Sequence, residues 1–139
     1  MAKLYPFEVH TPYRLFYSGS VEGIILTLSD GEIGVFADHS FFTAPVVPGI
    51  LKIKDNQGLW RTAFVSSGIL EVKNHKTVLM VDAAEWPTEI NRDRALAAKE
   101  QAEEALETGM FKFETLSARE KLKRAEIRLK VAESEARKN

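Results

Sequence analysis

The sequence predicts an α+β protein in which a β-rich domain is followed by a pair of helices. The first observation is a change of composition near residue 87. All five prolines, both tryptophans, all three tyrosines and seven of the eight glycines lie at or before that position. The second observation is a series of short β-type runs in the first part. The third is a pair of small apolar stripes at helical spacing in the second part.

The first part is predicted to consist of short strands separated by turns. Apolar or β-branched runs occur at residues 4–9, 15–17, 21–28, 33–36, 49–54, 60–66, 68–72 and 77–81. Turn residues separate them at Thr11-Pro12, Ser18-Gly19, Asp30-Gly31, residues 55–58 and Lys73-Asn74. Many short strands at close spacing are typical of a β-sandwich or a small barrel. A chain of about 85 residues is just long enough to bury such a core, so the stability of the domain is expected to be marginal.

The second part is predicted to form two helices. Small apolar residues recur at intervals of three and four at Ala95, Ala98, Ala102 and Ala105, and again at Leu122, Ala125, Leu129 and Ala132. Gly109 is placed to end the first helix, and Ser117 with Glu120 forms a capping-box pattern that predicts the start of the second. Matching stripes joined by a short loop predict an antiparallel hairpin. Because alanine buries little area, at about 25 cal/mol per Å², the helices are expected to separate readily.

The boundary between the two parts is expected at Trp86-Pro87-Thr88, because the residue before a proline is disfavoured in helical geometry. The predicted domains are therefore a sandwich at residues 1–86 and a helical arm at residues 87–139.

Composition excludes several classes of function. The formal net charge is −1, so the chain lacks the basic excess that a nucleic-acid partner requires. It contains no cysteine, which excludes disulfides, thiolate nucleophiles and cysteine-based metal sites. No run approaches the ~20 apolar residues that cross a bilayer, and no signal-peptide pattern is expected at the N-terminus. Any membrane association is therefore expected to come through another protein.

No pattern of catalytic residues is present. His10, His39 and His75 share no metal-ligand spacing, and no phosphate-binding glycine loop with Lys-Ser/Thr occurs. Asp82 and Glu85 could form a carboxylate pair, but polar residues at a strand end explain them more simply. An enzyme remains an alternative for which the sequence provides no site.

Two surface features have alternative interpretations. The block Asp30-Gly31-Glu32-Ile33-Gly34, followed by His39, is either a hairpin turn with solvated side chains or a contact surface. Phe41 and Phe42 are unusually apolar for a loop, and they either fill the core or face a partner.

The order and spacing of these motifs resemble those of the ε subunit of the F-type ATP synthase. The resembling blocks are Phe7-Glu8-Val9 with Thr11-Pro12, Ser18-Gly19, the segment 30–35 with His39, the segments 48–53 and 67–72, Ala83-Ala84-Glu85 and the segment 90–95. Three positions depart from the pattern: Ala37 and Phe41 stand where proline is common, and Ser67 stands where glycine is common.

The resemblance implies a fold, a role and a set of partners. It implies a ten-stranded antiparallel β-sandwich followed by an antiparallel two-helix hairpin. The implied role is that of a non-catalytic rotor subunit in the central stalk, which couples ion-driven rotation of the c-ring to ATP synthesis. The implied partners are the γ subunit, the c-ring and, through the arm, the α and β subunits of the catalytic head. The implied location is peripheral, on the cytoplasmic face of a bacterial plasma membrane or the stromal face of a thylakoid membrane.

The resemblance also implies candidate residues for each contact. Glu32 and His39, with Phe41 and Phe42, are expected at the interface with γ and the c-ring. The cations Arg119, Lys123, Arg124 and Arg128 are expected to let an extended arm inhibit ATP hydrolysis. The alternative for these cations is a solvated face balanced by Glu120, Glu126 and Glu133.

A degenerate ATP site is implied in the arm. Some bacterial relatives bind ATP through a motif of the form Ile/Leu-Asp-x-x-Arg-Ala. The residues that match this site are Glu85, Ile90, Arg94, Ala95, Arg124 and Arg128, whereas Asn91 replaces the aspartate and Gln101 replaces an arginine. Asn91 also suits a helix N-cap. No cofactor is expected, and the runner-up function is a free-standing adaptor whose hairpin binds partner helices.

Overall fold

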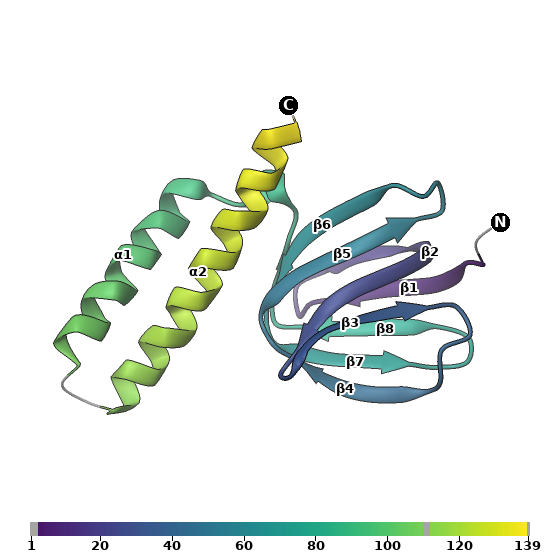
Figure 1. Cartoon of the computed structure of the whole chain (residues 1–139), viewed down its shortest axis with the longest axis horizontal. Helices are drawn as coiled ribbons and strands as arrows, with labels where there is room; N and C mark the ends of the chain where they lie inside the picture. Colours follow the sequence, from purple (N-terminus) through teal and green to yellow (C-terminus); the bar gives the residue numbers. More distant parts are fainter. Residues whose placement is uncertain (1–2, 110–111, 139) are drawn as a thin grey trace. The chain divides into compact units, whose positions relative to one another are not determined.

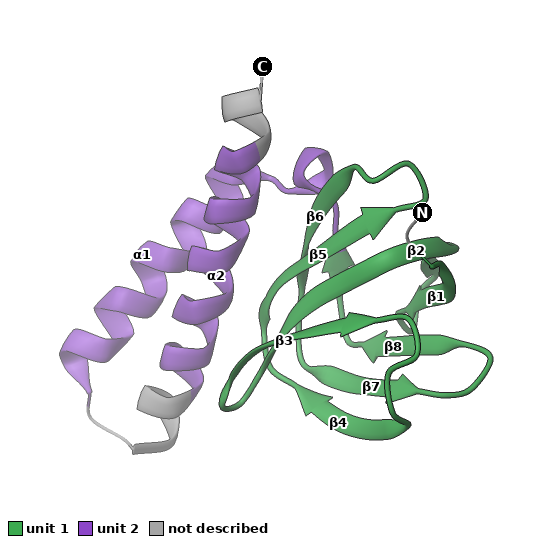
Figure 2. Ribbon diagram, turned by 45° about the vertical axis from the view of Figure 1, so that its right-hand side comes forward, with its two compact units in different colours: residues 1–84 green, residues 85–139 purple. Residues whose placement is uncertain are grey.

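The computed structural model describes the backbone of residues 3–109 and 112–138, and the side chains in these ranges other than 112–116 and 135–138. The chain divides into two compact units, residues 1–84 and residues 85–139, which Figure 2 shows in green and purple. The first unit is built from strands and the second from helices.

The strands form a β-sandwich. Their bounds are β1 Tyr5–His10, β2 Leu15–Leu28, β3 Gly31–Phe36, β4 Phe42–Val46, β5 Gly49–Asp55, β6 Trp60–Val65, β7 Gly68–Val72, β8 Thr77–Val81 and β9 Ala84–Glu85. The described residues thus contain nine strands where ten were expected, and the predicted fold class is confirmed. Neighbouring strands are antiparallel except β1 and β8, which are parallel.

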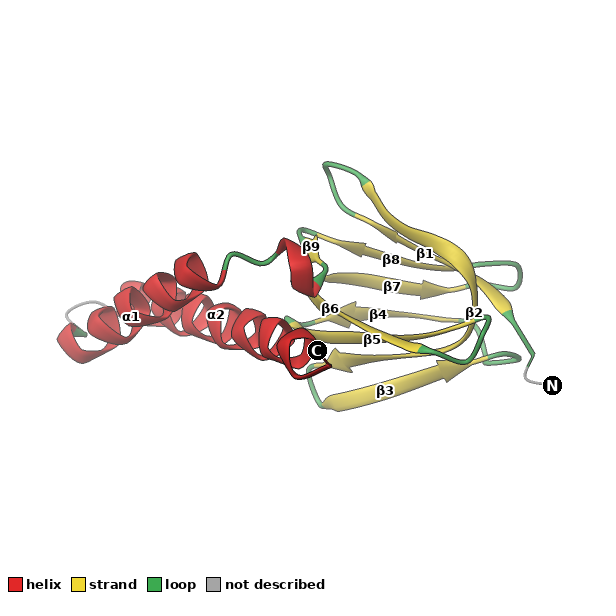
Figure 3. Ribbon diagram, turned by 90° about the horizontal axis from the view of Figure 1, so that it is seen from above, coloured by secondary structure: helices red, strands yellow, loops and turns green. Residues whose placement is uncertain are grey.

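The long strand β2 belongs to both layers of the sandwich (Figure 3). Its first half pairs with β1, and its second half pairs with β3 and β5. The register shifts between Val21 and Gly23, where the change of partner occurs. One layer therefore has the order β4-β7-β8-β1-β2, and the other contains β3, β2, β5, β6 and β9.

Alternating side chains fill the space between the layers, as the period of two along each strand predicts. The fully buried side chains include Phe7, Val9, Val21, Ile24, Leu26, Leu51, Ile53, Leu70 and Leu79. These residues lie on strands of both layers, so each layer contributes half of a shared core.

The prediction of a turn at Ser18-Gly19 was wrong, because β2 runs through both residues without interruption. Gly19 pairs with Phe7 of β1, and a Cβ at this position would lie 3.2 Å from the hydroxyl oxygen of Tyr17. The glycine therefore marks a close approach of side chains inside a strand.

Strand β4 was not predicted, because its sequence Phe-Thr-Ala-Pro-Val contains a proline. Pro45 cannot donate a backbone hydrogen bond, which is tolerated only at a sheet edge. β4 is the outermost strand of its layer and pairs only with β7 along the sheet. Phe42, which was assigned to a loop, is the first residue of this strand.

The second unit contains the short helix η1 Pro87–Glu89 and the helices α1 Arg92–Thr108 and α2 Lys112–Lys138 (Figure 1). Asn91 caps α1, since its Oδ1 accepts a hydrogen bond from the backbone N–H of Arg94 at 3.0 Å. Gly109 ends α1 in the left-handed conformation, with φ of 41°. Both predicted caps are therefore present. None of the helices in the described residues is long and apolar enough to span a bilayer.

The predicted start of the second helix at Ser117 was wrong, because α2 begins at Lys112. Ser117 and Glu120 both lie inside the helix. A serine within a helix costs only a few tenths of a kcal/mol, which is too little to stop a helix that packing supports.

The contact between the helices is narrow. Among the described side chains, Ala95 and Ala102 of α1 and Ala118, Ala125 and Val131 of α2 are buried. The members of the predicted stripes that stay partly or fully exposed are Ala98, Ala105, Leu122, Leu129 and Ala132. Small side chains therefore dominate the buried centre of the hairpin, as the sequence predicted.

Candidate functional site

A pocket of about 340 Å³ opens at the base of the hairpin, entirely within the second unit. Its lining residues come from the strand end, from η1, from the first turns of α1 and from α2: Glu85, Glu89, Ile90, Asn91, Arg94, Ala95, Ala98 and Arg128. The structure thus brings together Glu85, Ile90, Asn91, Arg94, Ala95 and Arg128 of the predicted ATP site. Arg124 and Gln101 do not line this pocket.

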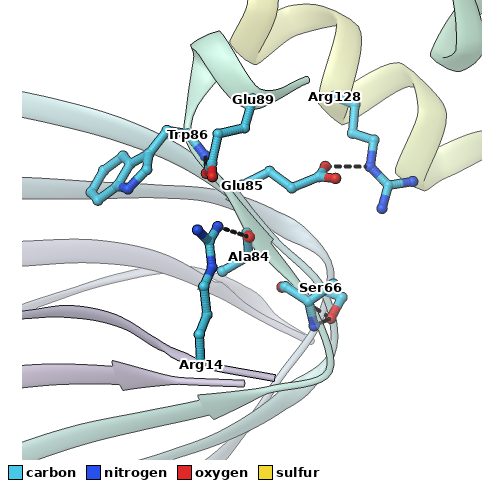
Figure 4. Close-up of polar contacts among 8 residues, drawn as sticks. Arg14, Ser66, Ala84, Glu85, Trp86, Glu89 and Arg128 are labelled. Carbon is cyan, nitrogen blue, oxygen red and sulfur yellow. Dashed lines mark hydrogen bonds and ion pairs between the residues drawn. The ribbon is translucent and has the colours of Figure 1, made fainter. Parts of the chain in front are cut away.

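Local hydrogen bonds shape one wall of the pocket. The backbone N–H of Trp86 donates to Oε1 of Glu89 at 2.9 Å across the turn of η1 (Figure 4). Ile90 follows η1 and is 9% exposed. Asn91 then starts α1, which directs Arg94 toward the pocket.

An ion pair lies inside the pocket. Nε of Arg128 donates to Oε1 of Glu85 at 2.7 Å, and the two side chains are 31% and 30% exposed (Figure 4). Arg128 is therefore already occupied by a carboxylate of its own chain. Arg128 is predicted from the sequence both as a cation of the arm and as part of the ATP site, and in the structure this cation has a carboxylate partner.

The charges of the pocket suit a polyanion poorly. The two arginines that line it face two glutamates, so the formal charge of the lining is close to balanced. A triphosphate could bind Arg128 only after the ion pair between Arg128 and Glu85 is broken. The side-chain oxygen of Asn91 is already engaged, because it caps α1.

We expect the full chain to bind ATP more weakly than micromolar. The two departures from the motif, Asn91 and Gln101, each remove a charged partner, and such a loss typically costs about 1.5–3 kcal/mol, or roughly tenfold or more in affinity. The variant Asn91→Asp with Gln101→Arg should bind correspondingly more tightly. Isothermal titration calorimetry measures both affinities, and micromolar binding by the unaltered chain would contradict the expectation.

No metal centre is formed by the described residues, because they contain no group of three or more His, Asp or Glu side chains placed to hold an ion. Nε2 of His10 lies 2.7 Å from Oε1 of Glu8, and Nδ1 of His39 lies 3.4 Å from the carbonyl oxygen of Ser40.

Glu32 and His39 lie toward opposite ends of β3. Glu32 is the second residue of the strand and pairs with Thr27, whereas His39 follows the other end of the strand. Four residues separate Glu32 from the end of the strand at Phe36, which is roughly 13 Å at about 3.3 Å per residue. The structure therefore does not bring these two residues together, although the sequence analysis placed them in one contact block.

The two phenylalanines have different environments. Phe41 is 65% exposed, whereas Phe42 is half-buried and its ring centroid lies 5.2 Å from that of His39. Both line an open pocket of about 380 Å³ with Val72 and Lys73. Phe41 therefore faces outward and Phe42 packs partly into its own unit.

The cations of α2 also differ in exposure. Arg119 and Lys123 are exposed, while Arg124 and Arg128 are half-buried. Glu120 and Glu126 are exposed on the same helix. The outer surface of α2 thus carries both charges, and Arg119 with Lys123 are its most accessible candidate cations.

The sequence analysis missed an apolar row on the outer face of the first layer. Each member of this row is the cross-strand partner of the next, from β4 through β7, β8 and β1 to β2. The five residues are Pro45, Ile69, Met80, His10 and Leu15. Ile69, Met80 and Leu15 are 46%, 41% and 53% exposed. At about 4.8 Å between strands, the row is roughly 19 Å wide.

The row contains one titratable side chain, His10, and both this side chain and the charges beside the row are paired within the layer. Glu8 accepts from His10 at 2.7 Å and from Lys76 at 3.4 Å, and Glu71 lies 3.1 Å from Lys73. The hydrogen bond with His10 lowers the pKa of Glu8, which keeps this carboxylate ionised near neutral pH. Residues 78–81, which are apolar at inward and outward positions alike, were the available signal, because such runs indicate strands covered on both faces.

Both units match known protein families. The model described as ATP synthase, Delta/Epsilon chain, beta-sandwich domain matches residues 5–87, and that of the long alpha-helix domain matches residues 88–133. The ATP synthase epsilon chain of Caldanaerobacter subterraneus is 47% identical over 133 residues, which cover 95% of this chain and 96% of that relative. The corresponding chain of Caldicellulosiruptor bescii is 46% identical over 129 residues, 93% of either protein.

Solved structures share the fold. A chain in the Euglena gracilis mitochondrial ATP synthase, a structure with OSCP, F1 and the c-ring, superposes with a TM-score of 0.71 at 20% identity, covering 98% of this chain and 82% of that one. A chain from the central stalk and c-ring of the Tetrahymena thermophila enzyme gives a TM-score of 0.61 at 13% identity, covering 94% and 97%.

Proposed function

Since this chain belongs to the ATP synthase delta/epsilon chain family, we propose that it is the ε-type subunit of the central stalk, a rotor component without a catalytic site of its own. In this role it binds the γ subunit and the c-ring through the sandwich and couples ion-driven rotation to ATP synthesis. The arm reaches the α and β subunits of the catalytic head and restrains ATP hydrolysis.

The observation that carries the rotor assignment is the apolar row of Pro45, Ile69, Met80, His10 and Leu15. An exposed apolar line across five strands is unusual for a face that stays in water, and it favours a protein partner. Because Glu8 and Glu71 already have cationic or imidazole partners in this layer, a partner that covers the face does not leave these two carboxylates unpaired. We assign this face to the γ subunit.

The two ends of β3 offer separate contact regions. Glu32 lies at one end, and His39, Phe41 and Phe42 lie at the other. A subunit that lies between γ and the c-ring needs contacts with both, and the separation of roughly 13 Å along the strand allows each end to contact one partner. We propose that Glu32 and the His39 region contact these two partners separately.

The native complex tests the assignment. The chain should co-purify with a membrane-bound ATP synthase and show no turnover when isolated. A soluble free pool with other partners would support the adaptor function instead and would refute the rotor role. The family places the protein at the periphery of a membrane. We propose the cytoplasmic face of a bacterial plasma membrane, since the relatives from Caldanaerobacter subterraneus and Caldicellulosiruptor bescii are bacterial, with the stromal face of a thylakoid membrane as the alternative.

We expect Met80→Glu to weaken binding to purified γ by about tenfold or more, because it places a charge in the centre of the apolar row. Leu59→Glu is the matched control, since Leu59 is 60% exposed at the turn between β5 and β6 and outside the row. Titration of labelled chain with γ measures the affinity. Equal binding by Met80→Glu and the unaltered chain would show that γ binds elsewhere.

A further inference from the structure

We propose that the ion pair of Glu85 and Arg128 is a latch that keeps the helical arm folded as a hairpin without any bound ligand. Its two members are 43 residues apart in the sequence. Glu85 lies where the arm begins, and Arg128 lies in the second half of α2. The contact therefore closes a segment that contains all of α1, Gly109 and the first half of α2.

The geometry of the contact is that of a strong interaction. The distance between Nε and Oε1 is 2.7 Å, and both side chains are about two-thirds buried. Charge-assisted hydrogen bonds of this length are stronger than neutral ones. Partial burial also protects the pair from the screening that weakens exposed ion pairs.

Other contacts that could hold the arm closed are weak by comparison. The buried seam consists mainly of Ala95, Ala102, Ala118 and Ala125, which remove little apolar area from water. The other ion pair described in the arm joins Arg92 of α1 to Glu133 of α2 at 3.8 Å, with side chains 63% and 47% exposed. An exposed ion pair at this distance contributes little to the stability of the folded arm.

The latch also occupies the place where a ligand would act. Glu85 and Arg128 both line the pocket of about 340 Å³ at the base of the hairpin. An anion that entered would have to compete with Glu85 for the guanidinium group. The Glu85 carboxylate thus binds the guanidinium group that a bound anion would otherwise bind, and this contact connects α2 to the start of the arm. This inference concerns the arm alone and does not depend on the proposed role in the rotor.

Hydrogen exchange of the full chain in ligand-free buffer tests the latch. We expect Glu85→Gln and Arg128→Gln each to lower the protection of backbone amides in α1 and α2 by about five- to tenfold. Because both variants remove the shared ion pair, the double variant should lose clearly less than the sum of the two single losses. The amides of β5 and β6 should keep their protection and so report that the sandwich is intact.

Arg92→Gln is the matched control, because it removes the exposed ion pair that joins Arg92 of α1 to Glu133 of α2. It should change protection by less than about twofold. Unchanged protection in Glu85→Gln and Arg128→Gln would overturn the latch. An equal loss in Arg92→Gln, or additive losses in the double variant, would also overturn it, since either result means that the two side chains do not act as one specific contact.

Discussion

Gly68→Ala is expected to unfold the sandwich or to leave it barely stable. Gly68 begins β7, where it pairs with Val81 of β8 and Val46 of β4. A Cβ at this position would collide with the carbonyl oxygen of Met80 and lie 2.7 Å from Cα of Val81. Both atoms belong to the backbone of a central strand, so neither can move without breaking the ladder between β7 and β8.

The free energy of unfolding is expected to fall by more than about 3 kcal/mol, which is at the upper end of the range for overpacked sites. The whole free energy of unfolding of a domain is roughly 5–15 kcal/mol. Urea unfolding followed by circular dichroism measures the change.

Gly34→Ala is the matched control for this prediction. Gly34 also lies within a strand, but a Cβ there would first meet Cε2 of Phe36 at 3.0 Å. The ring of Phe36 is 51% exposed and can move aside, so the loss should stay below about 1 kcal/mol. If both variants lost the same stability, backbone entropy rather than the collision at Gly68 would explain the result.

Elements with strong local signals could be predicted from the sequence. The alternation of residues 49–54 predicted β5 because each inward residue of that strand is apolar. Asn91 and Gly109 marked the ends of α1 because capping depends on one side chain or one φ angle. Where a residue had a second use, prediction failed: Gly19 resembles a turn residue but makes room for Tyr17.

Contacts between distant segments could not be predicted in the same way. The resemblance collected most of the residues of the arm pocket, but no local pattern indicates that Arg128 binds Glu85 rather than solvent. Glu32 and His39 seemed close because the chain between them is short, yet an extended strand separates its ends more than any other element. The apolar row is spread over five strands and is visible only once their register is known.

Removing α2 from the complex should raise ATP hydrolysis several-fold while assembly stays intact. A truncation after Gly109 removes the whole helix, whereas a cut at Ser117 would leave part of it. The sandwich keeps its own core and the apolar row, so incorporation should not depend on the arm. The hydrolysis rate of the reconstituted complex is the measurement, and an unchanged rate would end the inhibitory role.

The physical reason lies in the balance between folded and extended arms. A seam of small side chains keeps the two states within a few kcal/mol, so modest differential binding to the catalytic head shifts the population. The exposed cations Arg119 and Lys123, with the half-buried Arg124, are the groups proposed to meet acidic residues there. Changing all three to glutamine should raise hydrolysis in part, and less at high salt, where exposed charges are screened.

Charge-matched and latch variants separate this mechanism from a loss of structure. Glu120→Gln with Glu126→Gln removes two exposed charges of the opposite sign from the same helix, and it should not raise hydrolysis. Glu85→Gln should act in the reverse direction to truncation, because a released α2 reaches the catalytic head more often and inhibits more strongly. If Glu85→Gln raised hydrolysis as truncation does, the folded hairpin rather than the extended arm would be the inhibitory form.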